Sequence, residues 1–202
     1  MKCERIPLGA QGAYLDTYFL ADSPELKAGA CRPAVVVCPG GGYAYTSDRE
    51  AEPIALALCA RGFHACVLRY PCAPARFPAA LRALAEAVAW VRAGAAENHV
   101  DPRQISVCGF SAGGHLAGSL GVFWNAPFLA AETGLAPQDM RPDKMVLCYP
   151  VITGGEFAHK GSFDNLLGAD ADAARRAEVS LEQHVTQDTP PAFLWHTYTD
   201  PG

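Results

Sequence analysis

The chain has 202 residues, half of them hydrophobic, which is enough to bury a substantial core, and we predict one domain over residues 1–202. The formal charge is −5 and Lys and Arg do not cluster, which excludes the basic surface that nucleic acid or an anionic membrane would bind. No apolar run resembles a secretory signal or is long enough to span a membrane, so we expect a soluble, cytoplasmic protein.

Short apolar runs alternate with helical patterns along the chain, and this alternation predicts an α/β fold. We expect a mainly parallel sheet with helices on both faces. Strands are predicted over residues 13–20, 34–38, 63–70, 105–108, 144–149 and 192–196. Helices are predicted over residues 47–62, 77–91, 112–123 and 171–185. At the start of the first helix, Ser47 and Glu50 are predicted to cap one another's backbone amides. The segment at about 150–190 is interpreted as a cap-like insertion.

Eight cysteines are present, and four of them, Cys38, Cys66, Cys108 and Cys148, lie in or at the end of apolar strand-like runs. Cysteine in such runs behaves as a small hydrophobic residue, so free, buried thiols are expected. No C-x-x-C pair and no metal-ligand spacing occurs. We therefore predict no metal site and no organic cofactor.

The segment Gly109-Phe110-Ser111-Ala112-Gly113 lies between an apolar strand and a helix of small residues. A strand that turns sharply into a helix projects a serine clear of the backbone, and glycines two residues before and after it leave room for the turn. The positive end of the following helix also faces the developing negative charge. This pattern predicts that Ser111 is the nucleophile of an α/β hydrolase.

A second glycine-rich segment, Pro39-Gly40-Gly41-Gly42, follows the strand at 34–38. Taken alone, it is also consistent with an ordinary flexible turn. Its position upstream of the nucleophile favours an oxyanion hole, formed by the backbone amides of Gly41, Gly42 and Ala112. Tyr43, beside this loop, is a candidate substrate-binding residue, although an aromatic side chain there is as often simple packing.

The acid of such a site follows the nucleophile on a loop after a late strand. Asp200, directly after the strand at 192–196, is at that place. The alternative is an ordinary loop aspartate. With Ser111 and Asp200, the sequence supplies a candidate nucleophile and a candidate acid.

Several motifs together resemble the bacterial esterase/lipase-like α/β-hydrolases that are described as acetyl-xylan-esterase-like. The motifs are PGGGY at 39–43, SDREAEP at 47–53, VLRY at 67–70, CGFSAGGHLA at 108–117, CYPVI at 148–152 and PPAFLWHT at 190–197. The resemblance covers nearly the whole chain from about residue 5. It implies a Ser, Asp, His triad that hydrolyses short acyl esters, including acetyl groups on sugars.

In that family the catalytic histidine follows the acid, and only two residues follow Asp200 here. We therefore expect the histidine after residue 202, in a C-terminal part that this sequence lacks. His115 is expected to pack on the helix after the elbow, and His196 lies within a strand, so neither position suits a general base. The missing part would leave apolar surface uncovered at one sheet edge, which favours association into homo-oligomers.

The function predicted from the sequence is hydrolysis of small carboxylic esters through an acyl-serine intermediate, with a small-molecule ester as substrate. The same scaffold also supports peptidases and thioesterases. A large N-terminal propeller would indicate a peptidase, and a dedicated thioester-binding region would indicate a thioesterase. The sequence contains neither feature. A further alternative, from a different class, is a catalytically inactive hydrolase-like fragment or binding protein.

Overall fold

The computed structural model describes residues 1–10, 12–198 and 200 of the chain. Its sheet has the strand order β1-β2-β4-β3-β5-β6-β7. The β1/β2 and β2/β4 pairs are antiparallel, and every pair from β4 across to β7 is parallel. The strands are β1 Lys2–Pro7, β2 Tyr14–Phe19, β3 Arg32–Cys38, β4 His64–Arg69, β5 Val100–Phe110, β6 Lys144–Cys148 and β7 Ala192–Trp195.

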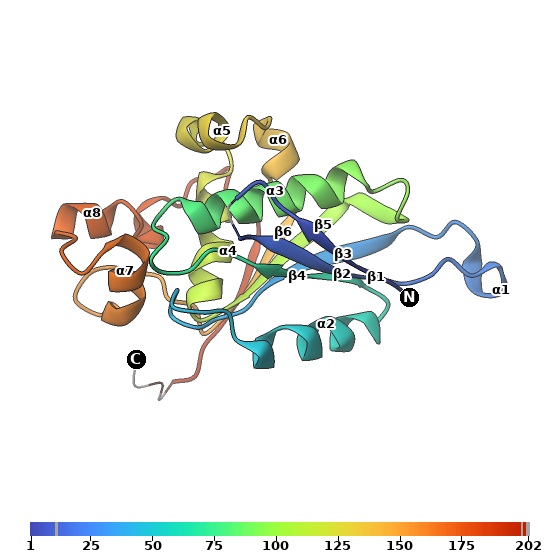
Figure 1. Cartoon of the computed structure of the whole chain (residues 1–202), viewed down its shortest axis with the longest axis horizontal. Helices are drawn as coiled ribbons and strands as arrows, with labels where there is room; N and C mark the ends of the chain where they lie inside the picture. Colours follow the sequence, from blue (N-terminus) through green and yellow to red (C-terminus); the bar gives the residue numbers. More distant parts are fainter. Residues whose placement is uncertain (11, 199, 201–202) are drawn as a thin grey trace.

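Helices cover both faces of the sheet: α3 lies above it in the view of Figure 1 and α2 below it. The helices are α1 Pro24–Lys27, α2 Glu52–Cys59, α3 Ala79–Ala93, α4 Ala112–Phe123, α5 Pro127–Thr133, α6 Pro137–Met140, α7 Lys160–Leu167 and α8 Ala173–Ala177, with 3-10 turns η1 Asp48–Glu50 and η2 Leu181–Gln183. The predicted α/β fold, with a mainly parallel sheet and helices on both faces, is confirmed. In the described residues, no helix is both long enough and apolar enough to cross a membrane.

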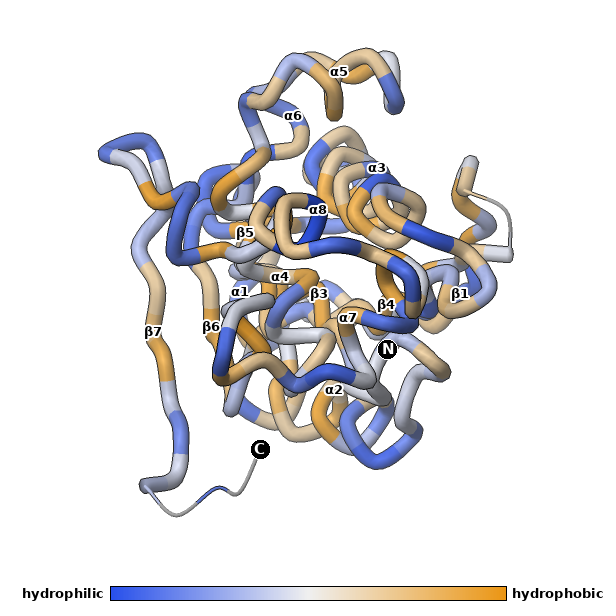
Figure 2. Tube along the Cα trace, turned by 90° about the vertical axis from the view of Figure 1, so that its left-hand side faces the viewer, coloured by the Kyte–Doolittle hydropathy of each residue, from blue (hydrophilic) through white to orange (hydrophobic). Residues whose placement is uncertain are grey.

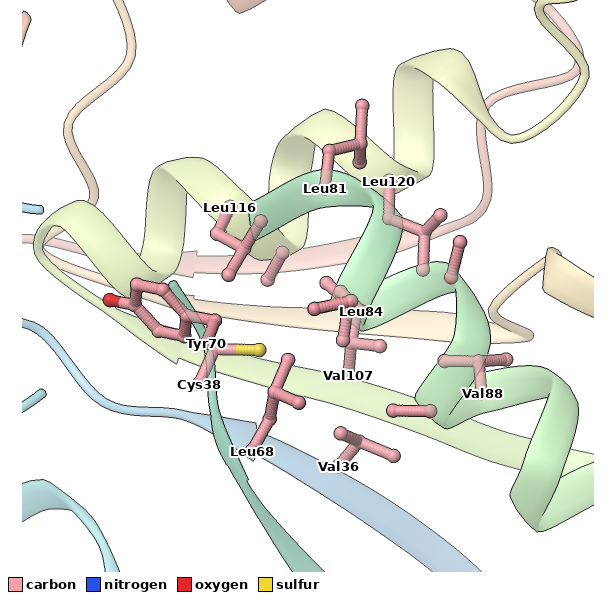
Figure 3. Close-up of a cluster of buried hydrophobic side chains, with 14 of the residues drawn as sticks. Val36, Cys38, Leu68, Tyr70, Leu81, Leu84, Val88, Val107, Leu116 and Leu120 are labelled. Atoms are coloured by element: carbon pink, nitrogen blue, oxygen red, sulfur yellow. The ribbon is translucent and has the colours of Figure 1, made fainter. Parts of the chain in front are cut away.

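The central strands are apolar on both sides because each side is buried under helices, as parallel sheets require. Alternate residues of β3 divide between two buried clusters: Val36 packs with α3 and α4, and Val35 and Val37 pack with α2. Figure 3 shows the first cluster, in which side chains of the sheet meet those of α3 and α4. Its labelled members are Val36, Cys38, Leu68, Tyr70, Leu81, Leu84, Val88, Val107, Leu116 and Leu120.

The strand β7 is an edge strand, and it stands at one margin of the molecule beside β6 (Figure 2). Its apolar side chains are open to solvent: Phe193 is 64% exposed, Leu194 56% and Trp195 46%. Successive residues of a strand point to opposite faces, so the sheet presents apolar surface on both faces at this edge.

The structure differs from the sequence-based expectations in several elements. The strand β1 and the helices α1, α5, α6 and α7 were not expected, and the single helix predicted over 171–185 is divided into α8 and η2. The predicted capping box is wrong: the Ser47 side chain makes no capping bond at η1, and the Glu50 carboxylate bonds elsewhere. All eight cysteines are free thiols as expected, but Cys148 is only partly buried.

Candidate active site

The predicted nucleophile Ser111 occupies the single position between β5 and α4. Its backbone has φ 52° and ψ −120°, a conformation that side-chain-bearing residues rarely adopt and that costs of order 1–3 kcal/mol. Three hydrogen bonds hold it: the Ser111 N–H donates to Cys148 O at 3.1 Å, and Ser111 O accepts from the N–H groups of His115 and Val151, both at 3.1 Å. The turn is therefore fixed by contacts from both β6 and α4.

Two glycines make this turn possible because main chain passes close to each of them. A Cβ atom at Gly109 would collide with the carbonyl group of Gly113, and a Cβ atom at Gly113 would collide with the carbonyl oxygens of Cys38 and Pro39. These neighbours are backbone atoms, which cannot rotate away as a flexible side chain can. The contact at Gly113 also brings the end of β3, and the glycine loop after it, against the start of α4.

The glycine loop lies beside Ser111. Gly41 has φ 132° and Gly42 has φ 62°, both in the region that favours glycine. In the part of the chain that the structure describes, neither of their N–H groups donates a hydrogen bond to a protein acceptor, so both can bind a ligand oxygen. The loop is anchored from two sides: the Tyr70 hydroxyl donates to Pro39 O at 2.5 Å, and the Asn165 side-chain amide donates to Gly42 O at 2.9 Å.

A cavity of about 1040 Å³ opens in front of Ser111 and the glycine loop. The predicted residues Ser111, Gly41, Gly42 and Asp200 all line it, and Ala112 lies next to Ser111 as the buried first residue of α4. Its wall also carries charged and aromatic side chains from the η1 region and from the segment between β6 and α7. These other residues are Ala44, Tyr45, Ser47, Arg49, Glu50, Tyr149, Pro150, Val151, Ile152, Thr153, Glu156, Phe157, Ala158, His159, Gly161, Asn165 and His196.

Asp200, the predicted acid, lies close to His196 in this cavity. The His196 Nε2 is 3.9 Å from Asp200 Oδ2, and the His196 Nδ1 donates to Thr197 O at 2.9 Å. A catalytic triad uses the opposite arrangement, in which the acid binds Nδ1–H and leaves Nε2 free for the serine. His196 therefore lies beside the acid without the orientation of a triad base.

Tyr43 does not line the cavity, which differs from its interpretation as a substrate-binding residue. Its side chain is 3% exposed and its hydroxyl bonds to Nδ1 of His115 at 2.8 Å. The Nε2–H of His115 donates to Val179 O at 2.8 Å. Tyr43 supports the glycine loop from the core side, and His115 packs beneath it, as expected for that histidine.

Burial makes His115 a source of acid sensitivity. Desolvation lowers its pKa to about 4, below the value of about 6.5 in an unfolded chain. Between these two pKa values only the unfolded chain binds the proton, so the free energy of unfolding falls as the pH drops from about 6.5 to about 4. One such group contributes a slope of at most about 1.4 kcal/mol per pH unit.

We predict that His115→Gln makes the dependence of the free energy of unfolding on pH shallower. The glutamine side chain can still form hydrogen bonds, but it has no titratable group. Urea unfolding at pH 7.5, 6.0 and 5.0 measures this dependence. Burial also lowers the pKa of His64, so some slope should remain in the variant. An unchanged slope in His115→Gln would show that His115 does not cause the sensitivity.

Glu50 lines the cavity and was not predicted to belong to the site. Its Oε2 accepts the Gly40 N–H at 2.7 Å, and its Oε1 accepts the Tyr149 hydroxyl at 2.9 Å. The sequence offered a local reason for this glutamate, a capping box with Ser47, and gave no signal for Tyr149, which is 99 residues away along the chain. Only the fold shows that Glu50 joins the glycine loop to the end of β6.

Comparison with known proteins agrees with this architecture, and the chain has the fold of the α/β hydrolases. The structure of an acetyl ester-xyloside bifunctional hydrolase from Caldicellulosiruptor lactoaceticus matches with a TM-score of 0.84 and 35% identity, covering 98% of this chain and 75% of that one. A carboxylesterase from Lactobacillus plantarum matches with a TM-score of 0.82 and 29% identity, covering 98% and 73%. The BD-FAE family model matches residues 22–202, and the chain belongs to this family.

Two curated relatives are similar over most of this chain. Endo-1,4-beta-xylanase B of Butyrivibrio fibrisolvens is 35% identical over 178 residues, 84% of this chain and 27% of the relative. The acetylxylan esterase of Xylanibacter ruminicola is 28% identical over 186 residues, 87% of this chain and 34% of the relative. The chain thus spans about a third or less of the length of these two proteins.

Proposed function

We propose that the protein is a serine carboxylesterase that hydrolyses short-chain acyl esters, including acetyl groups on carbohydrates. The observation that carries the proposal is the position of Ser111. Its strained backbone is held at a strand-to-helix turn, facing a cavity that two free glycine amides also line. A hydroxyl beside preorganised N–H donors is the arrangement that acyl transfer requires.

In the proposed mechanism the Ser111 hydroxyl attacks the ester carbonyl carbon while an imidazole takes its proton. The amides of Gly41, Gly42 and Ala112 stabilise the negative oxygen of the tetrahedral intermediate. The intermediate then collapses: the bond from carbon to the alcohol oxygen breaks, the imidazolium gives its proton to that oxygen, and an acyl-serine remains. Water hydrolyses the acyl-serine with the same imidazole as base. Asp200 orients that imidazole and stabilises its charged form. No step uses a metal or an organic cofactor.

We propose that the imidazole belongs to a histidine outside residues 1–202, because no described histidine combines a place in the cavity with the geometry of the base. His99 and His184 do not line the cavity. His64 and His115 are buried and use both ring nitrogens in hydrogen bonds. Two histidines line the cavity. The Nδ1 of His159 accepts a hydrogen bond from the Ser162 N–H, and the Nδ1 of His196 donates one to Thr197 O. Neither histidine can therefore bind the carboxylate of the acid through Nδ1 and at the same time direct its Nε2 toward Ser111.

The cavity wall favours short acyl chains. Burial of an acyl chain gains about 0.8 kcal/mol per CH₂ group only where apolar surface receives it. Here the charged side chains of Arg49 and Glu156 lie in the wall among apolar ones such as Val151 and Ile152, so a long acyl chain would find only part of the wall apolar. We expect kcat/KM to be at least about 10-fold higher for nitrophenyl acetate and butyrate than for the decanoate, on the full-length protein. A maximum at long chains would contradict the small-acyl proposal.

Other residues of the same cavity wall suit a sugar as the alcohol part of the ester. Tyr45 and Phe157 line the cavity and are exposed, 57% and 87% respectively, so their rings can receive the apolar face of a pyranose, while Arg49 and His159 can bond its hydroxyls. Acetate release from acetylated xylo-oligosaccharides tests this assignment, with an acyl thioester and a peptide anilide as comparison substrates. Faster turnover of either comparison substrate would favour a thioesterase or a peptidase.

A further inference from the structure

The Glu50 carboxylate is placed where it can control the geometry of the site. It belongs to η1, and each of its oxygens accepts from a different part of the chain: Gly40 at the start of the glycine loop and Tyr149 at the end of β6. A hydrogen bond from a neutral donor to a carboxylate is stronger than one to a neutral acceptor. The carboxylate thus joins two segments that are 109 residues apart along the chain, counted from Gly40 to Tyr149.

Glu50 lies very near the nucleophile without bonding to it in the described structure. A Cβ atom built on Gly40 would be 2.8 Å from Glu50 Oε2 and 3.1 Å from the Cβ atom of Ser111. Gly40 thus lies between the carboxylate and the serine. A small shift of the Gly40 peptide would move the following Gly41 and Gly42 amides relative to Ser111.

The second partner of Glu50 is linked to Ser111 as well. Tyr149 follows Cys148, whose carbonyl oxygen accepts the Ser111 N–H. Its backbone has φ 37°, and its ring packs against those of Phe110 and Trp195, at centroid distances of 6.0 and 5.6 Å. Burial and the Glu50 carboxylate raise the pKa of Tyr149, so its hydroxyl remains a donor at neutral pH.

We propose that Glu50 is a positioning residue that holds the Gly41 and Gly42 amides at the correct place relative to Ser111, by binding Gly40 and Tyr149 at once. This inference rests on the proposed esterase function. It assigns to Glu50 an effect on the transition state rather than on substrate binding, because the oxyanion forms only after the serine attacks. Loss of the hydrogen bonds from Gly40 and Tyr149 to Glu50 should therefore lower kcat and leave KM nearly unchanged.

The test compares variants of the full-length protein with nitrophenyl acetate. Glu50→Ala should lower kcat by about 100-fold, the loss typical of removing an oxyanion donor, with KM within about 2-fold. Glu50→Gln keeps a carbonyl oxygen for Gly40 and places its NH₂ group against the Tyr149 oxygen, so it should recover most of that loss. Tyr149→Phe removes one of the two bonds and should give an intermediate value of kcat.

Glu52→Ala is the matched control, because Glu52 is an exposed glutamate two residues away, at the first position of α2. It should keep the kcat of the parent protein. Melting temperature and circular dichroism of each variant separate loss of fold from loss of positioning. A folded Glu50→Ala with parental kcat, or a fall in kcat/KM that comes entirely from KM, would overturn the inference.

Glu50→Gln keeps the inference testable if Glu50→Ala does not fold: a folded Gln variant with kcat equal to that of Ser111→Ala would show a role other than positioning. The parent and Ser111→Ala are measured in the same series. Failure of the parent to show turnover that depends on Ser111 would reject the proposed function itself. Normal parental turnover with no effect at Glu50 would reject only the positioning role.

Discussion

Ser111→Ala is expected to lower kcat for nitrophenyl acetate by about 10⁶-fold in the full-length protein, with the fold intact. The alanine side chain has no atom that can form the acyl intermediate. The variant should still accelerate hydrolysis by about 10³- to 10⁴-fold over the reaction in water, through substrate binding and the backbone amides. The backbone bonds of Ser111 to Cys148, His115 and Val151 involve no side-chain atom, so the variant keeps them.

The measurement combines steady-state turnover, labelling by a fluorophosphonate probe, and thermal unfolding. Ser23→Ala is the matched control: Ser23 precedes α1, its side chain makes no capping bond, and α1 lies at the end of the molecule opposite α7 (Figure 1). It should be labelled and turn over substrate like the parent. Substantial turnover or labelling in pure Ser111→Ala would remove Ser111 from the mechanism.

The parts of the fold and site that could be predicted are those that short stretches of sequence determine. The strand–turn–helix around Ser111 depends on glycines two residues before and after it and on an apolar run on one side, and all of these are adjacent in the chain. The strands at the centre of the sheet were predicted for the same reason, because burial on both faces demands continuous apolar runs such as Val35-Val36-Val37.

The parts that could not be predicted depend on contacts between distant residues. Tyr43 is next to the glycine loop in sequence, and only the packing against His115 shows that its side chain turns into the core. The helix α7 has only eight residues, too few for a clear helical pattern in the sequence, but its Asn165 anchors Gly42 from 123 residues away. For Glu50 the local interpretation as a cap was physically reasonable, yet its carboxylate accepts instead from Gly40, ten residues away, and from Tyr149, 99 residues away.

The second large effect is expected at Asp200. Asp200→Asn should lower kcat by about 10⁴-fold while the protein stays folded, because an amide in place of the carboxylate holds the imidazole in the wrong tautomer. The side chain is 29% exposed and lines the cavity, so a substitution of equal size disturbs little packing. Turnover of nitrophenyl acetate measures kcat, and thermal unfolding shows whether the variant stays folded.

Two matched variants show what an effect at Asp200 means. Asp188→Asn changes an exposed aspartate on the loop before β7 and should leave kcat unchanged. His196→Gln removes the imidazole beside Asp200, and kcat should stay within about 10-fold of the parent, because the Nδ1 of His196 is occupied by Thr197 and a triad base needs that nitrogen for the acid. If Asp200→Asn kept the kcat of the parent protein, Asp200 would be an ordinary loop residue with no catalytic role. A loss in His196→Gln as large as that in Ser111→Ala would instead make His196 the base, reached through a rotation of its ring that frees Nδ1 for Asp200.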